Sequence, residues 1–466
     1  MVVMKFGGSS VADEAAIRRV VTLVERERRP KVVVISALTG VTDRLTVLAD
    51  LAATGAGGRA LAEVNRLRAR HVELARLVAR GRRDLLIALR REFGQACALV
   101  KAAAIVRKSA PRSIDAVLAC GELASSRIIA AALAAAGLPA VWIDARRIIV
   151  TDARHTRAVP LATRIVAAAD RLVRPHLDRG RLVVLGGFIG ATEQGATTTL
   201  GRGGSDYSAA LVGSAMGAEE IQIWTDVDGM LTGDPRLVPA PRLLSRVSFE
   251  DAAALARFGA KVLHPSTLAP AVAKNIPVRI LNARRAGVEG GTLIAGSPVR
   301  RQPIAGFASK GDLTVVTIQP LDGISPETLL KRAFGALERA GVVAELVALS
   351  DAGLSIAMQN RGGVAALQDD LSAVTAMAIR CRMALVCAVG ESLRGGAAAC
   401  SRLLAALEDI PVAMISHAGD GRTLACVIPE RALKTALGRL HDRYFGQTEE
   451  TAAIGPPHAG AGLPCR

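Results

Sequence analysis

Lys5, Gly7 and Gly8 are the first residues in the chain whose types and spacing could do chemistry. They lie between a short apolar run and a helical pattern. Glycines at the exit of a strand let phosphate oxygens approach backbone N–H groups, and the start of a helix adds a favourable dipole. A lysine at the strand end supplies a cation for a phosphoryl group in transit. A glycine pair is also a common tight turn, and the chain contains no GxxxxGK[ST] sequence, so we expect a phosphate-binding turn other than a P-loop.

A second group occupies residues 197–208, which read TTTLGRGGSDYS. Arg202 can bind a carboxylate through two parallel hydrogen bonds. Ser205 and Asp206 stand where a helix opens, and Asp206 could simply be the cap of that helix. The density of glycines, a guanidinium and short polar side chains within twelve residues favours a binding site over a cap alone.

Two further groups suit a nucleotide. The sequence IWTDVDG ends an apolar run in Thr225 and Asp226, and Asp-Pro-Arg follows with Arg236 as its last residue. A strand followed by such a turn would hold an adenosine-sized ligand at its carboxyl end. Lys261, in FGAKVLHP, is expected to reach the nucleotide phosphates. His264 has no nearby acid or nucleophile in the sequence, which favours a role in a turn over one in catalysis.

Alternating apolar runs and amphipathic stretches must position these groups. Through the first 295 residues the runs are apolar on both faces, which predicts a mainly parallel sheet covered by helices on two sides, a three-layer αβα fold. The expected strands are Val2–Phe6, Lys31–Ser36, Ala140–Asp144, Arg181–Gly186, Glu220–Thr225 and Val278–Leu281, and the helices include Ala12–Arg26 and Tyr207–Gly217. Residues 43–113 have no strand signal and are expected to form a helical insertion or lid over the carboxyl edge of the sheet.

The remainder of the chain repeats a smaller pattern after a linker expected at 296–308. Residues 309–382 and 383–450 each contain strand, helix and paired-strand signals, which predicts two ferredoxin-like α+β modules, followed by a flexible tail at 451–466. The expected elements are Leu313–Gln319, Glu327–Ala340, Val342–Leu349, Leu354–Gln359, Ala384–Val389, Gly396–Glu408, Val412–Ser416, Thr423–Ile428 and Ala432–Tyr444. Such modules commonly bind a small effector or dimerise, and packing alone is the other interpretation.

Composition limits the class of protein. A chain of 466 residues is expected to form two or three domains. The net charge of +17 could indicate nucleic-acid binding, but the basic residues are interleaved with acids along helices and only 3% of residues are aromatic, so no nucleic-acid partner is expected.

The sequence also limits the compartment. Polar residues and Pro139 interrupt the longest apolar stretch, at 123–143, and the start of the chain lacks a secretory pattern. The seven cysteines form no CxxC pair, so reduced thiols are expected and no protein-held metal site. We therefore expect a cytoplasmic protein with no membrane partner.

The motifs together resemble those of the aspartate kinases, in the order found in that family and over essentially the whole chain. The residues that carry the resemblance are KFGGSSVA at 5–12, GE at 121–122, TLGRGGSD at 199–206, WTD at 224–226, DPR at 234–236 and FGAKVLHP at 258–265. The C-terminal pair of units resembles ACT regulatory modules. The form is that of the single-activity, lysine-sensitive type, without a homoserine dehydrogenase domain.

The resemblance implies a role for each matching position. By this resemblance Lys5, Gly7 and Gly8 would line the phosphoryl path. The L-aspartate substrate would be bound by Ser36, Thr42, Glu122 (to its α-ammonium), Arg202 (to its α-carboxylate) and Ser205. Lys5 and Asp206 would be the catalytic positions, with Asp206 and Ser205 at the reacting end. ATP, carrying Mg²⁺, would be held by Lys5, Gly7, Gly8, Thr225, Asp226, Arg236 and Lys261.

The residues agree with such a reaction. A carboxylate acceptor is already ionised near neutral pH and needs no general base, which suits a chain without a His–acid or Ser–His arrangement. Alignment and cations must then do the catalysis. Two other interpretations remain: a kinase acting on glutamate, acetylglutamate or a nucleotide monophosphate, and a non-catalytic amino-acid sensor. Glu122 and Arg202 favour a free amino acid as substrate.

Some positions depart from the family pattern. Leu231 stands where relatives often carry an aromatic residue near the nucleotide. Lysine-sensitive relatives usually place glycine near Thr328, and a threonine would crowd an amino-acid effector there. The turn at 350–353 also reads as longer than usual. We therefore expect weakened or altered lysine inhibition, with the effector itself left open. Exposed strand edges in the C-terminal modules predict a homodimer or larger homo-oligomer.

Overall fold

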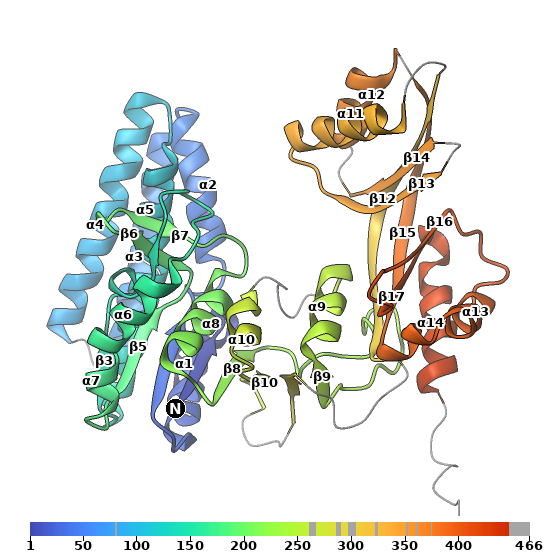
Figure 1. Ribbon diagram of the computed structural model, residues 1–466. Helices are drawn as coiled ribbons and strands as arrows, with labels where there is room; N and C mark the ends of the chain where they lie inside the picture. The colour runs from blue at the N-terminus through green and yellow to red at the C-terminus, as the bar shows by residue number, and fades with distance from the viewer. Residues whose placement is uncertain are drawn as a thin grey trace, which may run out of the picture. The chain divides into compact units, whose positions relative to one another are not determined.

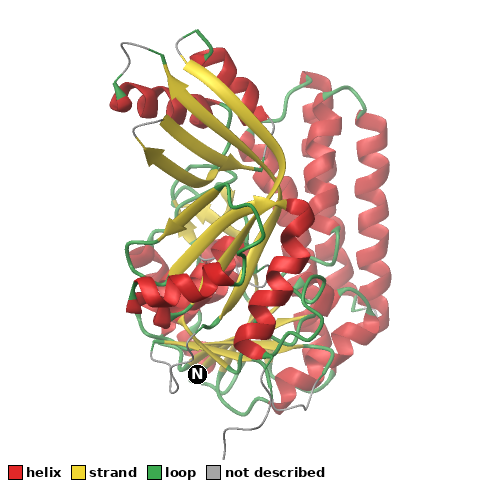
Figure 2. Cartoon of the chain, turned by 90° about the vertical axis from the view of Figure 1, so that its right-hand side faces the viewer, coloured by secondary structure: helices red, strands yellow, loops and turns green. Residues whose placement is uncertain are grey.

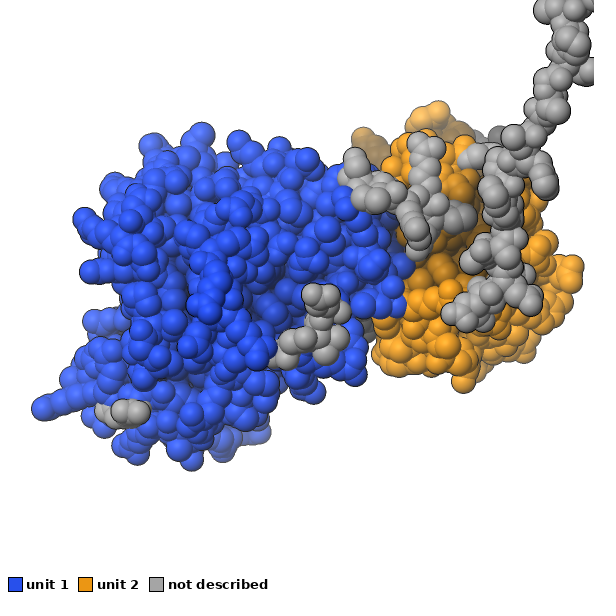
Figure 3. All heavy atoms as spheres, turned by 90° about the horizontal axis from the view of Figure 1, so that it is seen from below, with its two compact units in different colours: residues 1–230, 243–301 blue, residues 231–242, 302–466 orange. Residues whose placement is uncertain are grey.

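The computed structural model describes residues 1–79, 82–260, 267–285, 290–296, 304–321, 325–350, 353–359, 362–373 and 375–446. The described chain divides into two compact units, coloured separately in Figure 3. Unit 1 consists of residues 1–230 and 243–301, and unit 2 of residues 231–242 and 302–466. The chain therefore enters unit 2 twice, whereas the sequence predicted one continuous αβα domain over the first 295 residues.

Unit 1 is built on an eight-stranded sheet of order β3-β5-β2-β1-β8-β10-β11-β9 (Figure 1). Every neighbouring pair is parallel except β10 and β11. The six expected strands are all present, with ends displaced by at most two residues, and β9 and β11 are additional. The bounds are β1 Val2–Phe6, β2 Lys31–Ile35, β3 Ala140–Trp142, β5 Leu182–Gly186, β8 Glu220–Thr225, β9 Arg246–Ser248, β10 Val278–Asn282 and β11 Thr292–Ala295.

A second, smaller sheet in unit 1 has the order β4-β6-β7. Its strands have two to four residues each, which is too short to give a periodic signal in the sequence. They are β4 Val150–Thr151, β6 Ile189–Thr192 and β7 Thr197–Thr199. Its strands β6 and β7 lead the chain from the end of β5 to the helix that carries Ser205 and Asp206.

The helices of unit 1 pack around the main sheet, and the long ones α3, α4 and α5 run side by side (Figure 2). The described residues between 43 and 113 form α2, α3, α4 and the start of α5, joined by short turns, and these helices pack against one another. The bounds are α1 Glu14–Arg26, α2 Val41–Ala53, α3 Gly57–Val78, α4 Arg83–Val106, α5 Pro111–Ala135, α6 Ala162–Leu172, α7 Arg174–Leu177, α8 Gly204–Met216, α9 Phe249–Phe258 and α10 Ala269–Ala273, with short 3-10 turns at Gly8–Val11 and Ala145–Arg147.

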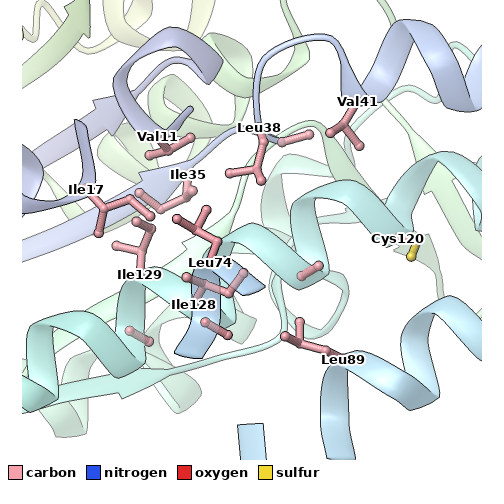
Figure 4. Packing of buried hydrophobic residues seen from close by; sticks show 14 of the residues in the cluster. Val11, Ile17, Ile35, Leu38, Val41, Leu74, Leu89, Cys120, Ile128 and Ile129 are labelled. Carbon is pink, nitrogen blue, oxygen red and sulfur yellow. The ribbon is translucent and has the colours of Figure 1, made fainter. Parts of the chain in front are cut away.

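Helix α5 is the central helix of unit 1. Ile128 and Ile129 lie among the buried residues of its core, close to Ile17 and Ile35 (Figure 4). Its length and apolar composition would suffice to cross a membrane, but 89% of its most apolar window is buried inside the protein. It also carries two fully or almost fully buried carboxyl groups, on Asp115 and Glu122. These features are those of a core helix of a folded domain.

Unit 2 contains one six-stranded antiparallel sheet of order β13-β14-β12-β15-β17-β16. Two strands, β12 Gly306–Pro320 and β15 Thr375–Val389, run its full length and pair with each other. The others are β13 Ala344–Ser350, β14 Gly353–Met358, β16 Met414–His417 and β17 Thr423–Pro429. Each half of the sheet carries its own helices and its own apolar core.

The two halves are the expected ferredoxin-like modules, but they are nested rather than successive. In lobe 1, residues 314–320 of β12 lie between β14 and the first half of β15, under α11 Pro326–Arg339 and α12 Gly362–Leu371. In lobe 2, residues 306–310 of β12 pair with the second half of β15, beside β17, with α13 Ala397–Ala405 and α14 Leu433–Phe445. The linker expected at 296–308 is therefore wrong at its end, because residues 306–308 form the first part of β12.

Residues 231–242 are held within unit 2 by hydrogen bonds. The backbone oxygen of Thr232 accepts from the Phe307 amide at 2.8 Å, and its hydroxyl lies 2.9 Å from Nε2 of His441. His441 is buried, and burial lowers its pKa. A neutral imidazole can keep this hydrogen bond inside the lobe 2 core.

Candidate active site

The strand register brings several sequence-predicted residues to one edge of the main sheet. Phe6, the last residue of β1, is paired with Ile35 of β2 on one side and Trp224 of β8 on the other. The carboxyl ends of these parallel strands are therefore level, and the next residues along each chain segment, Gly7, Ser36 and Thr225, are neighbours. Such an edge is where ligands of open α/β sheets bind.

Lys5 and Asp206 form an ion pair at this edge. The Lys5 Nζ lies 2.6 Å from Oδ1 of Asp206, with only 11% and 14% of the two side chains exposed. The contact is an ion pair and not a hydrogen bond, because no donor among the described residues, including Lys5, is at a suitable angle to Oδ1 of Asp206. Asp206 belongs to the first turn of α8, where the helix N-terminus favours a negative charge. Residues 5 and 206, 201 positions apart in the sequence, are thus in direct contact.

Glycines allow the loops of this site to approach closely. A Cβ on Gly8 would lie 2.9 Å from the carbonyl oxygen of Ala37, and one on Gly187 would lie 2.7 Å from Cβ of Ser205. Real Cβ atoms do not come so close to backbone or to a short side chain. Gly8 is thus packed against the loop after β2, and Gly187 against the start of α8.

Glu122 is buried next to the loop that follows β2. Its Oε1 accepts from the Ala37 amide at 3.3 Å, while its Oε2 has no hydrogen-bond partner among the described residues. Burial raises the pKa of this carboxyl group from 4.5 to about 8, against the lowering effect of the Ala37 hydrogen bond. On the same helix, the Ser125 hydroxyl donates to the Ser36 backbone oxygen at 2.8 Å. Helix α5 therefore fixes this loop and keeps a carboxyl oxygen available beside it.

Thr225 and Asp226 lie on the other side of β1. The Thr225 hydroxyl donates to Oδ1 of Asp226 at 3.3 Å, and Asp226 is exposed. The Asn282 amide, at the end of β10, donates to Oδ1 of Asp228 at 2.7 Å and closes the turn after Asp226. This arrangement leaves the polar groups of Thr225 and Asp226 at the surface of the sheet edge.

Other predicted residues are placed less directly. Thr42 lies in the first turn of α2, after Gly40, and Arg202 is exposed in the loop before α8, between two glycines with positive φ. Arg236 lies in unit 2, where its guanidinium is paired with Asp234 at 2.6 Å. The predictions for Lys261 and His264 fall outside the described residues.

Two residues at this edge were not expected from the sequence. Phe188 adopts a positive φ of 65° immediately after the glycine pair, and its ring fills the place that a Cβ on Gly204 would need. Asp115 is fully buried and accepts hydrogen bonds from three residues outside its helix. The signal for Asp115 was present, as one of two carboxylates on the buried face of a long apolar helix. The sequence offered no indication of its partners.

The arrangement is that of a site for phosphoryl transfer to an anion. It offers glycine-lined backbone, a fixed ammonium group at Lys5, and a buried carboxyl group at Glu122 that could receive a cation. Within the described part of the chain, His, Cys, Asp and Glu side chains form no group of three that could hold a metal ion.

Comparisons with known proteins agree with this geometry. Residues 1–282 match the amino acid kinase family. The chain is 31% identical to lysine-sensitive aspartokinase 3 of Escherichia coli over 453 residues, covering 96% of this chain and 99% of that one. It is 30% identical to an aspartate kinase of Pseudomonas fluorescens, covering 95% of this chain and 97% of that one.

Solved structures give the same result. The chain is similar to E. coli aspartokinase III in complex with aspartate and ADP, with a TM-score of 0.81, 30% identity, and coverage of 96% of this chain and 100% of that one. It is equally similar to the same E. coli protein in complex with lysine and aspartate, with a TM-score of 0.82, 30% identity, and coverage of 96% and 99%.

Proposed function

Because this chain belongs to the amino acid kinase family, and within it to the aspartokinases, it is an aspartate kinase, and we propose which residues perform the reaction. The reaction transfers the terminal phosphoryl group of ATP to the β-carboxylate of L-aspartate and yields 4-phospho-L-aspartate. The observation that carries the proposal is the contact between Lys5 and Asp206 at the sheet edge where Gly7, Ser36 and Thr225 meet.

Aspartate binds on the α5 side of the edge. Oε2 of Glu122, which has no partner among the described residues, receives the α-ammonium group. The exposed guanidinium of Arg202 receives the α-carboxylate, to which it can donate two parallel hydrogen bonds. Ser36, Thr42 and Ser205 supply the remaining polar contacts.

ATP binds on the β8 side of the edge. The Gly8 amide faces its phosphates, next to Gly7, whose own amide donates to the Trp224 oxygen at 3.1 Å. Thr225 and Asp226 hold the nucleoside. Arg236, which belongs to unit 2, and Lys261, which lies outside the described residues, remain nucleotide contacts predicted from the sequence. Mg²⁺ arrives bound to the ATP phosphates as part of the substrate and offsets their charge. The carboxylate pair Asp226 and Asp228, at the exit of β8, lies on this side.

The chemical step needs alignment and charge compensation rather than a base. The acceptor carboxylate is ionised and attacks directly, while the Lys5 ammonium neutralises charge on the transferring phosphoryl oxygens. Asp206 fixes the Lys5 amine through the 2.6 Å ion pair, so the cation is in place before substrates bind. Such preorganisation lowers the barrier because little has to reorient in the transition state.

The test is the Lys5→Ala variant, assayed for acyl phosphate by trapping with hydroxylamine, first with aspartate and then with glutamate as acceptor. We expect turnover to fall by about three orders of magnitude or more in a protein that still folds, with a lower melting temperature because Asp206 loses its ion-pair partner. Lys101→Ala, at an exposed position on α4, is the matched control and should keep full activity. Near wild-type turnover in a folded Lys5→Ala protein would remove Lys5 from the mechanism.

The regulatory properties extend the proposal. We infer that the ferredoxin-like lobes of unit 2, which share one six-stranded sheet, are ACT modules able to bind an amino-acid effector. Their outermost strands β13 and β16 present unpaired edges within the described sheet, which suit pairing with a second copy of the chain, so we infer a homodimer or larger homo-oligomer. We place the enzyme in the cytoplasm, with its cysteines reduced; the six in the described part are free thiols.

A further inference from the structure

A buried carboxylate on α5 organises loops next to the acceptor site. Asp115 is fully buried, and its two oxygens accept hydrogen bonds from several donors. The Thr199 hydroxyl donates to Oδ1 at 2.6 Å, and Nδ1 of His155 lies 2.8 Å from Oδ2. The Thr156 amide donates to both oxygens at 3.0 Å. Charge-assisted bonds of this kind are stronger than neutral ones, so the cluster is a firm attachment between three segments of unit 1.

The segments that Asp115 joins lead directly to the predicted acceptor residues. Thr199 is the last residue of β7, three positions before Arg202. Thr156 and Arg157 lie against Gly201: a Cβ added to Gly201 would be 3.5 Å from the Thr156 oxygen and 3.6 Å from Cγ of Arg157. The loop at 152–159 thus supports the loop that carries Arg202.

The backbone of the supporting loop is held in an unfavourable conformation. Thr156 has a φ of 70°, a region that a β-branched residue rarely adopts. Its N–H group points to Asp115 in this conformation. A strained backbone conformation persists only where contacts with its surroundings hold it in place. At Thr156 these contacts are the hydrogen bonds from its amide to the Asp115 carboxylate.

We propose that Asp115 is a positioning residue for aspartate binding, which acts through Thr199 and the Thr156–Arg157 backbone to place Arg202. The inference rests on the proposed role of Arg202 at the α-carboxylate. Asp115 and Glu122 are seven residues apart on α5, so they lie on one face of the helix, about 10 Å apart along its axis. One helix therefore fixes the two sides of the acceptor site, through Glu122 at the loop after β2 and through Asp115 at the loop before α8.

The test separates positioning from stability. Asp115→Asn keeps the shape but removes the charge and one acceptor, and Thr199→Val keeps the shape but removes the hydroxyl. We expect each to raise the KM for aspartate about 10- to 100-fold, with a much smaller effect on the KM for ATP. In the double variant the increase in the KM for aspartate should be smaller than the product of the two single increases, because both substitutions remove the same hydrogen bond. Thr199→Ser, which keeps the hydroxyl, should restore the KM to within a few-fold of the wild-type value.

Two controls complete the design. Glu92→Gln alters another buried carboxylate, which is paired with Arg127 of the same helix α5 at 3.3 Å, and should lower the melting temperature without changing the KM for aspartate. Thr156→Gly keeps the N–H donor and relieves the positive φ, and should bind aspartate normally. An aspartate KM within twofold of wild type in folded Asp115→Asn, or equal increases for both substrates, would overturn the inference. Arg202→Ala reports separately on the proposed function: a normal aspartate KM there removes the role of Arg202, whatever Asp115→Asn does.

Discussion

Binding of aspartate should be coupled to loss of a proton from Glu122. Burial raises the pKa of this carboxyl group to about 8, so at pH 7 only about a tenth of the free enzyme carries it ionised. If the α-ammonium of aspartate requires the ionised form, its apparent affinity is reduced by that fraction. The KM for aspartate should therefore fall about tenfold between pH 6 and 7 and about fivefold between pH 7 and 8, and level off above pH 8.

The Glu122→Gln variant removes this coupling while keeping the shape of the side chain. Loss of a buried charge opposite the substrate ammonium should raise the KM for aspartate about 100-fold at pH 8 or above, and the dependence on pH should disappear. The assay is acyl-phosphate formation at saturating ATP across pH 6 to 9. Glu92→Gln, at another buried glutamate, should keep the wild-type pH profile. A flat wild-type profile between pH 6 and 8, or a sloping one in Glu122→Gln, would refute the reasoning.

The same group makes stability depend on pH in a defined direction. Between pH 4.5 and 8 the folded protein holds a proton on Glu122 that the unfolded chain has lost, so the contribution of Glu122 to stability falls as pH rises through this window. The difference between 4.5 and about 8 corresponds to about 5 kcal/mol, an upper bound for the cost above pH 8. Without substrate, Glu122→Gln should lose this decline and be more stable than wild type at pH 8.

Two further predictions follow from close contacts in each unit. Gly187→Ala would put a Cβ 2.7 Å from Cβ of Ser205, and the resulting displacement of the start of α8 should reduce turnover about 100-fold. The control is Gly94→Ala, in open space on α4, which should keep activity and gain up to about 1 kcal/mol in unfolding free energy. Equal activities of the two variants would contradict the packing argument. Ordinary cellular lysine concentrations should not inhibit the enzyme, because the Thr328 amide already donates to the Ser325 hydroxyl at 3.3 Å and a threonine in the first turn of α11 leaves less room for an effector than glycine would. A lysine titration with half-inhibition in that range would refute this, and Thr328→Gly should increase sensitivity.

Local patterns in the sequence predicted the strands and the turns of the site well. Val2–Phe6 and Glu220–Thr225 are apolar runs bounded by turn residues, and both strands begin and end at the predicted residues. Lys5 and Asp206 could be grouped because both flank glycine turns at expected strand and helix ends. Their 2.6 Å contact depends on β1 lying beside β8 and under α8, which is a property of the sheet order rather than of either segment.

Long-range pairing explains what the sequence could not show. Residues 306–310 pair with 385–389 of β15, about 80 positions away, so the first strand of lobe 2 precedes the whole of lobe 1. Local sequence patterns alone would assign such a strand to the nearest module or to a linker. Segment 231–242 is a similar case, because its attachment to Phe307 and His441 leaves no periodic trace. The roles of Arg236 and Lys261 stay predictions, because Arg236 belongs to unit 2 and Lys261 lies outside the described residues.

Helix α5 shows how function can override the rules that govern a core. A buried carboxyl group with an oxygen that lacks a partner is costly, and a chain selected for stability alone would replace Glu122 with an apolar or amide residue. Asp115, on the same face, is equally buried but fully bonded. The two carboxyl groups therefore have different roles. Both oxygens of Asp115 accept hydrogen bonds from the protein, whereas Oε2 of Glu122 has no partner among the described residues and is available to a ligand. An unpaired buried acid beside a phosphate-binding edge is therefore best explained by a cationic ligand that completes it, and the α-ammonium of aspartate is such a group.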